Sequence, residues 1–207
     1  MPFHLVEHPL AQNALLELRD LTTAPPAFRR AAHRISLFLG TEALKDIPSL
    51  TATVTTPLGE EATGQRVGGD VVVMPVLRAG MSMLDAVLEL VPSARVGHVG
   101  LQRNETTAIA STYYSKLPPN LRDSYIVVID PMLATGGSAI AAIDLIKAAG
   151  GRSIRLISIV AAPEGIAALE THHPDVAVYA PVVDSHLNAQ KYIVPGLGDF
   201  GDRLYGT

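Results

Sequence analysis

The sequence contains no cysteine in its 207 residues, and it is poor in charge. Without cysteine, a disulfide framework and a cysteine metal site are both excluded. Charged residues make up 17% of the chain, against a usual figure of about 25%. A surface with few charges is typical of a chain that hides part of that surface in a homo-oligomer, and we expect a homodimer or a larger assembly.

The sequence also lacks a basic excess and a long apolar run. Its formal net charge of −4 offers no electrostatic footprint for a nucleic acid. The longest apolar run, Val71–Leu77, is far too short to span a bilayer. The segment Met1–His8 lacks the basic segment and apolar stretch of a signal peptide. We therefore expect a soluble cytoplasmic protein that has neither a nucleic acid nor a membrane as a partner.

The length fits one domain, residues 1–207. Two helical patterns come first, from Leu10 to Leu21 and from Pro25 through Leu39, and we interpret residues 1–50 as an N-terminal helical arm. A weakly alternating stretch at Thr51–Thr56 predicts a strand. The turn-rich segment that follows it contains four glycines and indicates a hairpin.

From Asp70 onward, strand and helix patterns alternate, which is typical of an α/β fold. We expect a doubly wound, mostly parallel sheet with helices on both faces. The predicted strands are Val71–Val76, Arg95–Leu101, Tyr125–Ile129, Ile154–Val160 and Val176–Tyr179; the predicted helices are Met81–Val91, Ala139–Ala149 and Glu164–Thr171.

One stretch carries the strongest chemical signal. The apolar strand Tyr125–Ile129 ends in Asp130, and the small residues Thr135–Ser138 then precede a helix, for which Ser138 is a candidate cap. A glycine turn at a helix start points several N–H groups at one place and favours a phosphate. A carboxylate beside it is better suited to accept hydrogen bonds from sugar hydroxyls. The stretch predicts a ribose 5-phosphate site, with a strand, turn and helix that bind nothing as the alternative.

Two arginines follow other predicted strands. Arg78 comes after Val71–Val76, at the sheet edge where Asp130 is also expected, and its planar fork can bind a pyrophosphate. Gly80 permits a close backbone approach. Arg103 begins a polar stretch that runs through Ser111 and is long enough to form a flap that excludes water. A solvent-facing arginine is the alternative at both positions.

The stretch Tyr192–Asp202 holds three glycines and Pro195, which predicts irregular backbone with N–H and C=O groups free for a ligand. A pyrimidine base needs such an edge. Uracil presents an acceptor, a donor and an acceptor, which pair with N–H, C=O and N–H groups of a loop. Cytosine would place an acceptor against the C=O group and a donor against one of the N–H groups. A site of this kind rejects the wrong pattern by as much as ~10⁴.

These motifs resemble the loops of type I phosphoribosyltransferases, and Asp130-Pro131 is similar to the uracil branch of that superfamily. Most other members have two consecutive acids there. The resemblance implies phosphoribosyl pyrophosphate (PRPP) binding by Arg78, Arg103, Asp199 and the run Asp130, Pro131, Met132, Leu133, Ala134, Thr135, Gly136, Gly137 and Ser138. It implies uracil binding by Ile193, Gly198, Asp199 and Phe200. The chain departs from the family pattern at Gln102, where tyrosine is common, and at Phe200, where alanine is common.

The implied reaction joins uracil to PRPP and releases UMP and pyrophosphate. Asp199 and Arg103 are the expected catalytic residues, with Asp199 nearest the reacting centre. Mg²⁺ is expected as the cofactor, held through PRPP and water rather than by a protein metal site. The resemblance also implies GTP as a candidate effector and a homo-oligomeric state.

Three alternatives stay open. A phosphoribosyltransferase for a purine base would keep the PRPP loop and need another base pocket. A regulator that senses uracil nucleotides and binds RNA would need a basic face, which the acidic composition disfavours. A catalytically silent homologue would not need to retain Arg78, Asp130 and Asp199. A serine hydrolase has little support, because Ser138 lacks an evident histidine partner.

Overall fold

The computed structural model describes the backbone of residues 1–103 and 110–207. Its central sheet has the order β1-β12-β10-β8-β4-β6-β7, with β5 also paired to β4. Neighbouring strands are parallel throughout, except that β7 runs antiparallel to β6. The strands are β1 (Phe3–Leu5), β4 (Asp70–Leu77), β5 (Arg95–Val96), β6 (His98–Arg103), β7 (Ala110–Lys116), β8 (Ser124–Ile129), β10 (Ser153–Ile157) and β12 (Ala177–Ala180).

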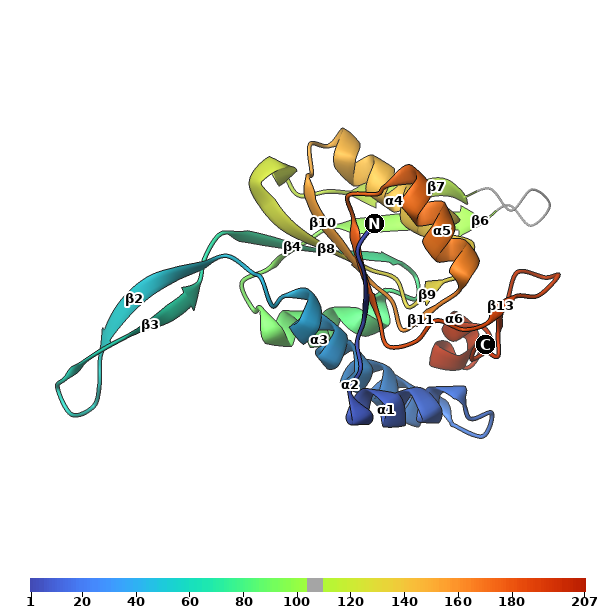
Figure 1. The fold of residues 1–207 in the computed structure, drawn as a ribbon, viewed down its shortest axis with the longest axis horizontal. Helices are drawn as coiled ribbons and strands as arrows, with labels where there is room; N and C mark the ends of the chain where they lie inside the picture. Colours follow the sequence, from blue (N-terminus) through green and yellow to red (C-terminus); the bar gives the residue numbers. More distant parts are fainter. Residues whose placement is uncertain (104–109) are drawn as a thin grey trace.

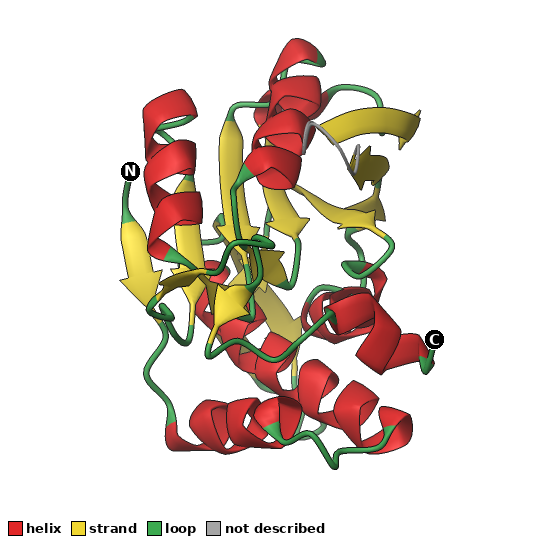
Figure 2. Ribbon diagram, turned by 90° about the vertical axis from the view of Figure 1, so that its right-hand side faces the viewer, coloured by secondary structure: helices red, strands yellow, loops and turns green. Residues whose placement is uncertain are grey.

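Helices cover both faces of this sheet (Figures 1 and 2). One face packs against α4 (Gly137–Ala148) and α5 (Pro163–His172). The other packs against α2 (Pro25–Ala43) and α3 (Met81–Leu90), with α1 (Pro9–Arg19) packed against α2. Strand β8 shows the division, because Val127 and Ile129 belong to one core cluster and Ile126 and Val128 to the other. The prediction of a doubly wound, mostly parallel sheet is confirmed.

The two central strands place the candidate site. Strands β4 and β8 run parallel in the register Val71↔Tyr125 to Pro75↔Ile129, so their carboxyl ends meet at one edge of the sheet. Both strands are buried almost throughout, as expected for strands covered on both faces. Arg78 and Asp130 therefore follow their strands at the same edge.

The N-terminal residues are part of the core. In α2, Phe28, Ile35 and Leu39 are fully buried against the sheet layer. Residues Phe3–Leu5 pair in parallel with β12 as the edge strand of the sheet, which the sequence patterns did not predict. Residues 1–50 thus supply an edge strand in addition to the two predicted helices, and those helices form one layer against the sheet.

The part of the chain that projects is a β-hairpin (Figure 1). Strands β2 (Ser49–Thr55) and β3 (Glu61–Val67) pair antiparallel, and nearly all their residues are exposed. The predicted strand at Thr51–Thr56 is confirmed with a shift of one or two residues. The segment after it forms the second strand of the hairpin rather than turns alone.

Two predicted strands are wrong in extent because the chain changes partners within them. Arg95–Leu101 divides into β5 and β6 at Gly97, whose N–H bonds to Val73 O. Ile154–Val160 divides into β10 and the short strand β11 (Val160–Ala161), which leaves the main sheet to pair with β9 (Met132–Leu133). The remaining elements are η1 (Leu121–Asp123), β13 (His186–Leu187), β14 (Ile193–Val194) and α6 (Phe200–Tyr205).

Within the described residues, no helix has both the length and the apolar character needed to cross a bilayer.

Candidate active site

The segment after β8 is held in place by the neighbouring chain. The backbone N–H groups of Ile159 and Val160 both donate to Pro131 O, and the Ala162 N–H donates to Leu133 O at 2.9 Å. The same two stretches form the β9–β11 pairing. These bonds fix the course of the loop that leaves Asp130. Pro131 O accepts two of these hydrogen bonds. Pro131 is not among the residues that line the adjacent cavity, although its neighbours Asp130 and Met132 are.

The glycine turn starts helix α4 directly. Gly136 has a φ of +82° and occupies the N-cap position, so the helix begins at Gly137. The predicted cap is wrong: Ser138 is the second residue of the helix, because the left-handed glycine turns the chain two residues earlier. The first N–H groups of the helix have no partner within it and are oriented to receive an anion.

A cavity of about 300 Å³ lies over this helix start. Its lining includes eight of the nine residues predicted for the phosphate loop, together with Asp199 and Phe200 from the C-terminal segment. Asp130 lies at its edge, where Met132 N is 3.5 Å from Asp130 Oδ1. Burial raises the pKa of Asp130 from 3.8 to about 7, and the hydrogen bond from the Met132 N–H opposes this shift without cancelling it. Hydrogen bonds from hydroxyl groups strongly stabilise the ionised form of a carboxyl group that is buried in this way.

A second cavity, of about 500 Å³, contains Arg78. Its other lining residues include Ala79, Gln102, Tyr113 and Asp199. Gly80 is needed for a different reason from the one expected, since a Cβ there would lie 2.5 Å from Ile129 O and 2.6 Å from Val76 O. The close approach is between two parts of the protein backbone. Arg78 itself is exposed to the cavity and to solvent.

The flap prediction lies largely outside the described residues. Arg103 is the last residue of β6, and the description stops there and resumes at Ala110. The predicted pyrophosphate contact of Arg103 therefore stays a prediction. Tyr113 and Tyr114, which follow the predicted flap, belong to β7, and Tyr113 lines the same cavity as Arg78.

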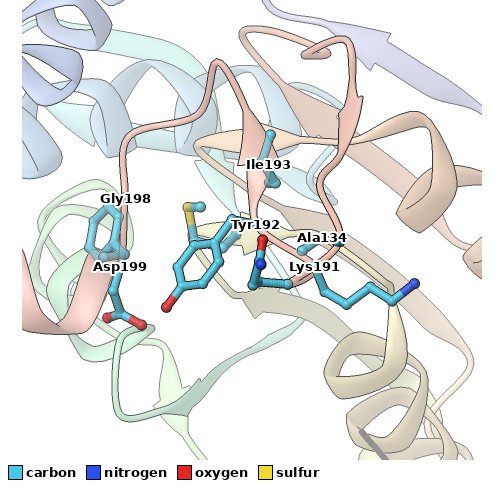
Figure 3. A pocket seen from close by; sticks show the side chains of 10 residues that line it. Ala134, Lys191, Tyr192, Ile193, Gly198 and Asp199 are labelled. Carbon is cyan, nitrogen blue, oxygen red and sulfur yellow. The ribbon is translucent and has the colours of Figure 1, made fainter.

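A third cavity, of about 540 Å³, is formed by the C-terminal segment and the phosphate loop. Ile193, Gly198, Asp199 and Phe200 line it, and all four were predicted for base binding. Figure 3 shows Tyr192 and Asp199 extending into the same opening, with the Lys191 side chain directed away from Asp199.

The base cavity also contains residues that the sequence reasoning missed. Ala189, Gln190, Lys191 and Tyr192 line it. Asn188 Oδ1 accepts hydrogen bonds from the N–H groups of Gln190 and Tyr192, which folds this stretch into a turn. An asparagine followed by polar residues before a glycine-rich segment is the local signal that could have identified this turn.

The C-terminal segment is more regular than predicted. Ile193–Val194 form β14, antiparallel to β13, and α6 starts at Phe200. Asp199 caps this helix by accepting the Asp202 N–H at 2.9 Å, and Gly206, with a φ of +76°, ends it. The prediction of irregular backbone is wrong at Ile193–Val194 and from Phe200 to Asp202, because strand pairing, the Asp199 cap and the terminating Gly206 outweigh the glycine content.

Asp199 lines all three cavities. The cavities adjoin, since the first and the third share Met132, Ala134 and Phe200, and the first and the second share Ala79 and Gly201. The arrangement offers a helix start for a phosphate, an arginine for a second anion and a backbone-lined recess for a planar ring. Among the described residues, no group of three or more acidic or histidine side chains could hold a metal by itself.

The solved structures of other proteins give the class first. A hypoxanthine-guanine phosphoribosyltransferase of Bacillus anthracis superposes with a TM-score of 0.51 at 11% identity, covering 75% of this chain and 78% of that one. That likeness concerns the fold alone. Together with the doubly wound sheet, it assigns the chain to the class of proteins with the type I phosphoribosyltransferase fold.

The family follows from closer relatives. The family model for uracil phosphoribosyltransferase matches residues 5–207. The uracil phosphoribosyltransferase of Dictyoglomus thermophilum is 46% identical over 203 residues, covering 98% of each chain. That of Pediococcus pentosaceus is 44% identical over 205 residues, covering 99% of this chain and 98% of its own. A solved protein of Aquifex aeolicus is 36% identical with a TM-score of 0.94, covering 99% of this chain and 98% of that one. The chain belongs to the uracil phosphoribosyltransferase family.

Proposed function

We propose that this chain transfers the ribose 5-phosphate of PRPP to N1 of uracil, giving UMP and pyrophosphate, as a salvage transferase. Membership of the family supports the reaction. The observation that carries the assignment to this site is the position of Asp199, which lines three adjoining cavities. Three substrate parts meet at the reacting carbon, namely the base, the ribose phosphate and the pyrophosphate, and three recesses that meet at one side chain match that requirement.

In this proposal, the start of α4 holds the 5-phosphate with the N–H groups that follow Gly136. Asp130 accepts hydrogen bonds from the ribose hydroxyls. Its raised pKa supports this role, because hydrogen bonds from the ribose hydroxyls would add to the Met132 N–H contact and stabilise the ionised carboxylate. Arg78 binds the pyrophosphate in the neighbouring cavity with its planar fork.

The base occupies the cavity between the C-terminal segment and the phosphate loop. Phe200 is the first residue of α6, so its N–H is not used within the helix and can donate to a carbonyl of uracil. Ile193 and Gly198 supply the remaining backbone groups of the recognition edge. Selection of uracil over cytosine would then depend on backbone hydrogen bonds rather than on a particular side chain.

Magnesium fits this site as a companion of PRPP. Asp130 and Asp199 both line the ribose-phosphate cavity and offer the hard oxygen donors that Mg²⁺ prefers. Two carboxylates are too few to hold the ion alone, so phosphate oxygens and water would complete its ligands. Held in that way, Mg²⁺ would supply positive charge to offset the negative charge of the pyrophosphate.

Catalysis in this scheme depends on positioning and charge. The bond between the ribose C1 and the pyrophosphate oxygen breaks with oxocarbenium character, and N1 of uracil attacks the same carbon. Arg78 and Arg103 stabilise the leaving pyrophosphate, and Asp199 lies nearest the reacting centre. The N1 proton passes to water as the new bond forms, which balances the step. Holding the two reactants in line supplies much of the acceleration.

The test is product formation by purified protein with PRPP and Mg²⁺, offering uracil, cytosine, hypoxanthine and adenine in parallel. We expect UMP and pyrophosphate from uracil alone. Turnover of a purine base would replace the proposed substrate, and PRPP or UMP binding without turnover of any base would indicate a sensor or a silent homologue.

The remaining expectations concern regulation and assembly. The family resemblance implies GTP as an effector, and the same assay with and without GTP tests this. The low charge of the chain favours a homodimer or a larger homo-oligomer, which sedimentation of the purified protein measures. We place the enzyme in the cytoplasm, and fractionation of the producing cells tests that location.

A further inference from the structure

We call Tyr192–Asp202 the base segment, and its backbone is held by hydrogen bonds at Gly196. The Gly196 N–H donates to Asp184 Oδ2 at 2.8 Å, and Gly196 O accepts from Arg19 Nη1 at 2.9 Å. The same arginine forms a two-pronged pair with Asp184, with contacts of 2.6 and 2.9 Å. Both backbone groups of Gly196 are therefore engaged by one ion pair.

Of the two side chains in this ion pair, that of Asp184 is buried and that of Arg19 is partly exposed. The Asp184 side chain is 3% exposed and that of Arg19 is 20% exposed. Asp184 is itself fixed to β11, because its N–H donates to Ala161 O at 2.8 Å. A buried carboxylate with three hydrogen bonds in fixed directions makes a rigid support.

A second arginine continues the support by one residue. Arg203 Nη1 donates to Leu197 O at 3.0 Å and also contacts Leu18 O. Arg19 is the last residue of α1 and Leu18 precedes it. The carboxyl end of α1 is thus connected to two consecutive peptide groups of the base segment.

The groups that face the cavity lie on either side of this support. Ile193 precedes Gly196 by three residues and Gly198 follows it by two, and both line the base cavity. The middle of the segment can accept no side chain, since a Cβ on Gly196 would lie 2.1 Å from Ile193 O. The support therefore acts on Gly196 and Leu197, and the recognition edge is carried by their neighbours.

We propose that Asp184, together with Arg19, is a positioning residue that sets the affinity for uracil and the choice of base. This inference rests on the proposed function. The ion pair does not line any of the three cavities and acts only through the backbone of Gly196. The PRPP loop is held by other bonds, from Ile159, Val160 and Ala162, so a change at Asp184 should affect one substrate and spare the other.

The experiment compares steady-state kinetics of the full chain for wild type and Asp184→Asn. Asparagine keeps the shape and removes the charge, and the partly exposed Arg19 can then be solvated. We expect the KM for uracil to rise by about tenfold to a hundredfold, while the KM for PRPP changes by less than about threefold. The ratio of kcat/KM for uracil over cytosine falls with it.

Two further variants make the result decisive. Arg19→Lys keeps a positive charge beside Asp184 but cannot contact both the carboxylate and Gly196 O with a planar fork, so it should raise the KM for uracil by a smaller factor. Asp70→Asn is the matched control. Asp70 forms a similar two-pronged pair with Arg95 at the opposite edge of the sheet, and its substitution should leave both KM values unchanged.

Each outcome decides the proposal. Equal changes in both KM values, no change in either, or the same split in Asp70→Asn would overturn it and leave the ion pair a structural role. If Asp184→Asn does not fold, Arg19→Lys decides alone, and an unchanged KM for uracil in that variant overturns the proposal. A wild-type protein that does not use uracil would instead reject the proposed function, and this inference would be rejected with it.

Discussion

Phe200 packs edge-on against Phe28, with ring centroids 5.0 Å apart and an angle of 66° between the rings. The pair joins the first residue of α6 to the buried face of α2 across most of the chain length. Phe200 is 2% exposed, so its ring is directed into the core, and the residue also lines the base cavity. This arrangement accounts for a phenylalanine at a position where the family resemblance implies alanine.

We expect Phe200→Ala to destabilise the protein and to keep the choice of base. Removing a buried aromatic ring typically costs about 3–5 kcal/mol. Recognition through the backbone should keep the uracil-to-cytosine ratio of kcat/KM near that of wild type. Urea unfolding measures the first effect and the substrate panel the second. Tyr205→Ala, in the same helix but 49% exposed, is the control and should cost much less stability. A reversal of base preference in Phe200→Ala would show that the ring forms part of the recognition surface.

We expect Arg78→Ala to lose most activity through its contact with the pyrophosphate. Arg78 lines the cavity that adjoins the ribose-phosphate cavity at Asp199 and Ala79. Removing one donor to developing charge typically lowers kcat by about 10²–10³. Arg78→Lys retains the charge without the planar fork and should recover part of the loss. Normal PRPP turnover by Arg78→Ala would disprove the assignment.

We expect Asp130→Asn to stabilise the unliganded protein above pH 7 while it weakens PRPP use. Burial raises the pKa of Asp130 in the folded chain to about 7, above its ordinary 3.8. Between these values the folded state binds more protons than the unfolded state, so the wild type loses stability as the pH rises. Asparagine does not titrate, so its advantage should be small at pH 4.5 and full at pH 7.5. A gain of 1 kcal/mol raises Tm by about 2–4 °C in a domain of this size.

Thermal unfolding of both proteins across that pH range, without ligands, measures the difference. Equal Tm differences at both ends of the range would mean that Asp130 titrates normally. The kinetic part is checked separately, by the KM for PRPP at pH 7.5, where the amide cannot replace a carboxylate as a two-fold acceptor for ribose hydroxyls.

We expect Gly165→Ala to weaken PRPP binding from outside the cavity. A Cβ on Gly165 would lie 2.5 Å from Ala134 O and 2.8 Å from Leu133 O, so the new methyl group must displace the phosphate loop. The KM for PRPP should rise by about tenfold or more, since small displacements of reacting groups have large effects. Gly64→Ala is the control, because nothing lies within 4 Å of the added Cβ. A normal KM for PRPP in Gly165→Ala would mean that the loop tolerates the shift.

Much of the sheet could be predicted locally. The strands β4 and β8 are continuous apolar runs because they are covered on both faces, and a pattern of this kind can be recognised without knowing the partners. The strand breaks at Gly97 and before Val160 could not be predicted locally, because they depend on which strand the chain pairs with next. The edge strand Phe3–Leu5 is three residues long and has no periodicity to detect.

The site divides in the same way. By itself, the sequence determined the phosphate loop after Asp130, since an apolar strand, a glycine turn and a helix start are adjacent in the chain and their geometry follows from local backbone preferences. Only the tertiary structure decided that Asp199 lies where three cavities adjoin, and that Asp184 and Arg19, 165 residues apart, support Gly196. Those relationships depend on hydrogen bonds and packing between distant segments, which no local pattern encodes.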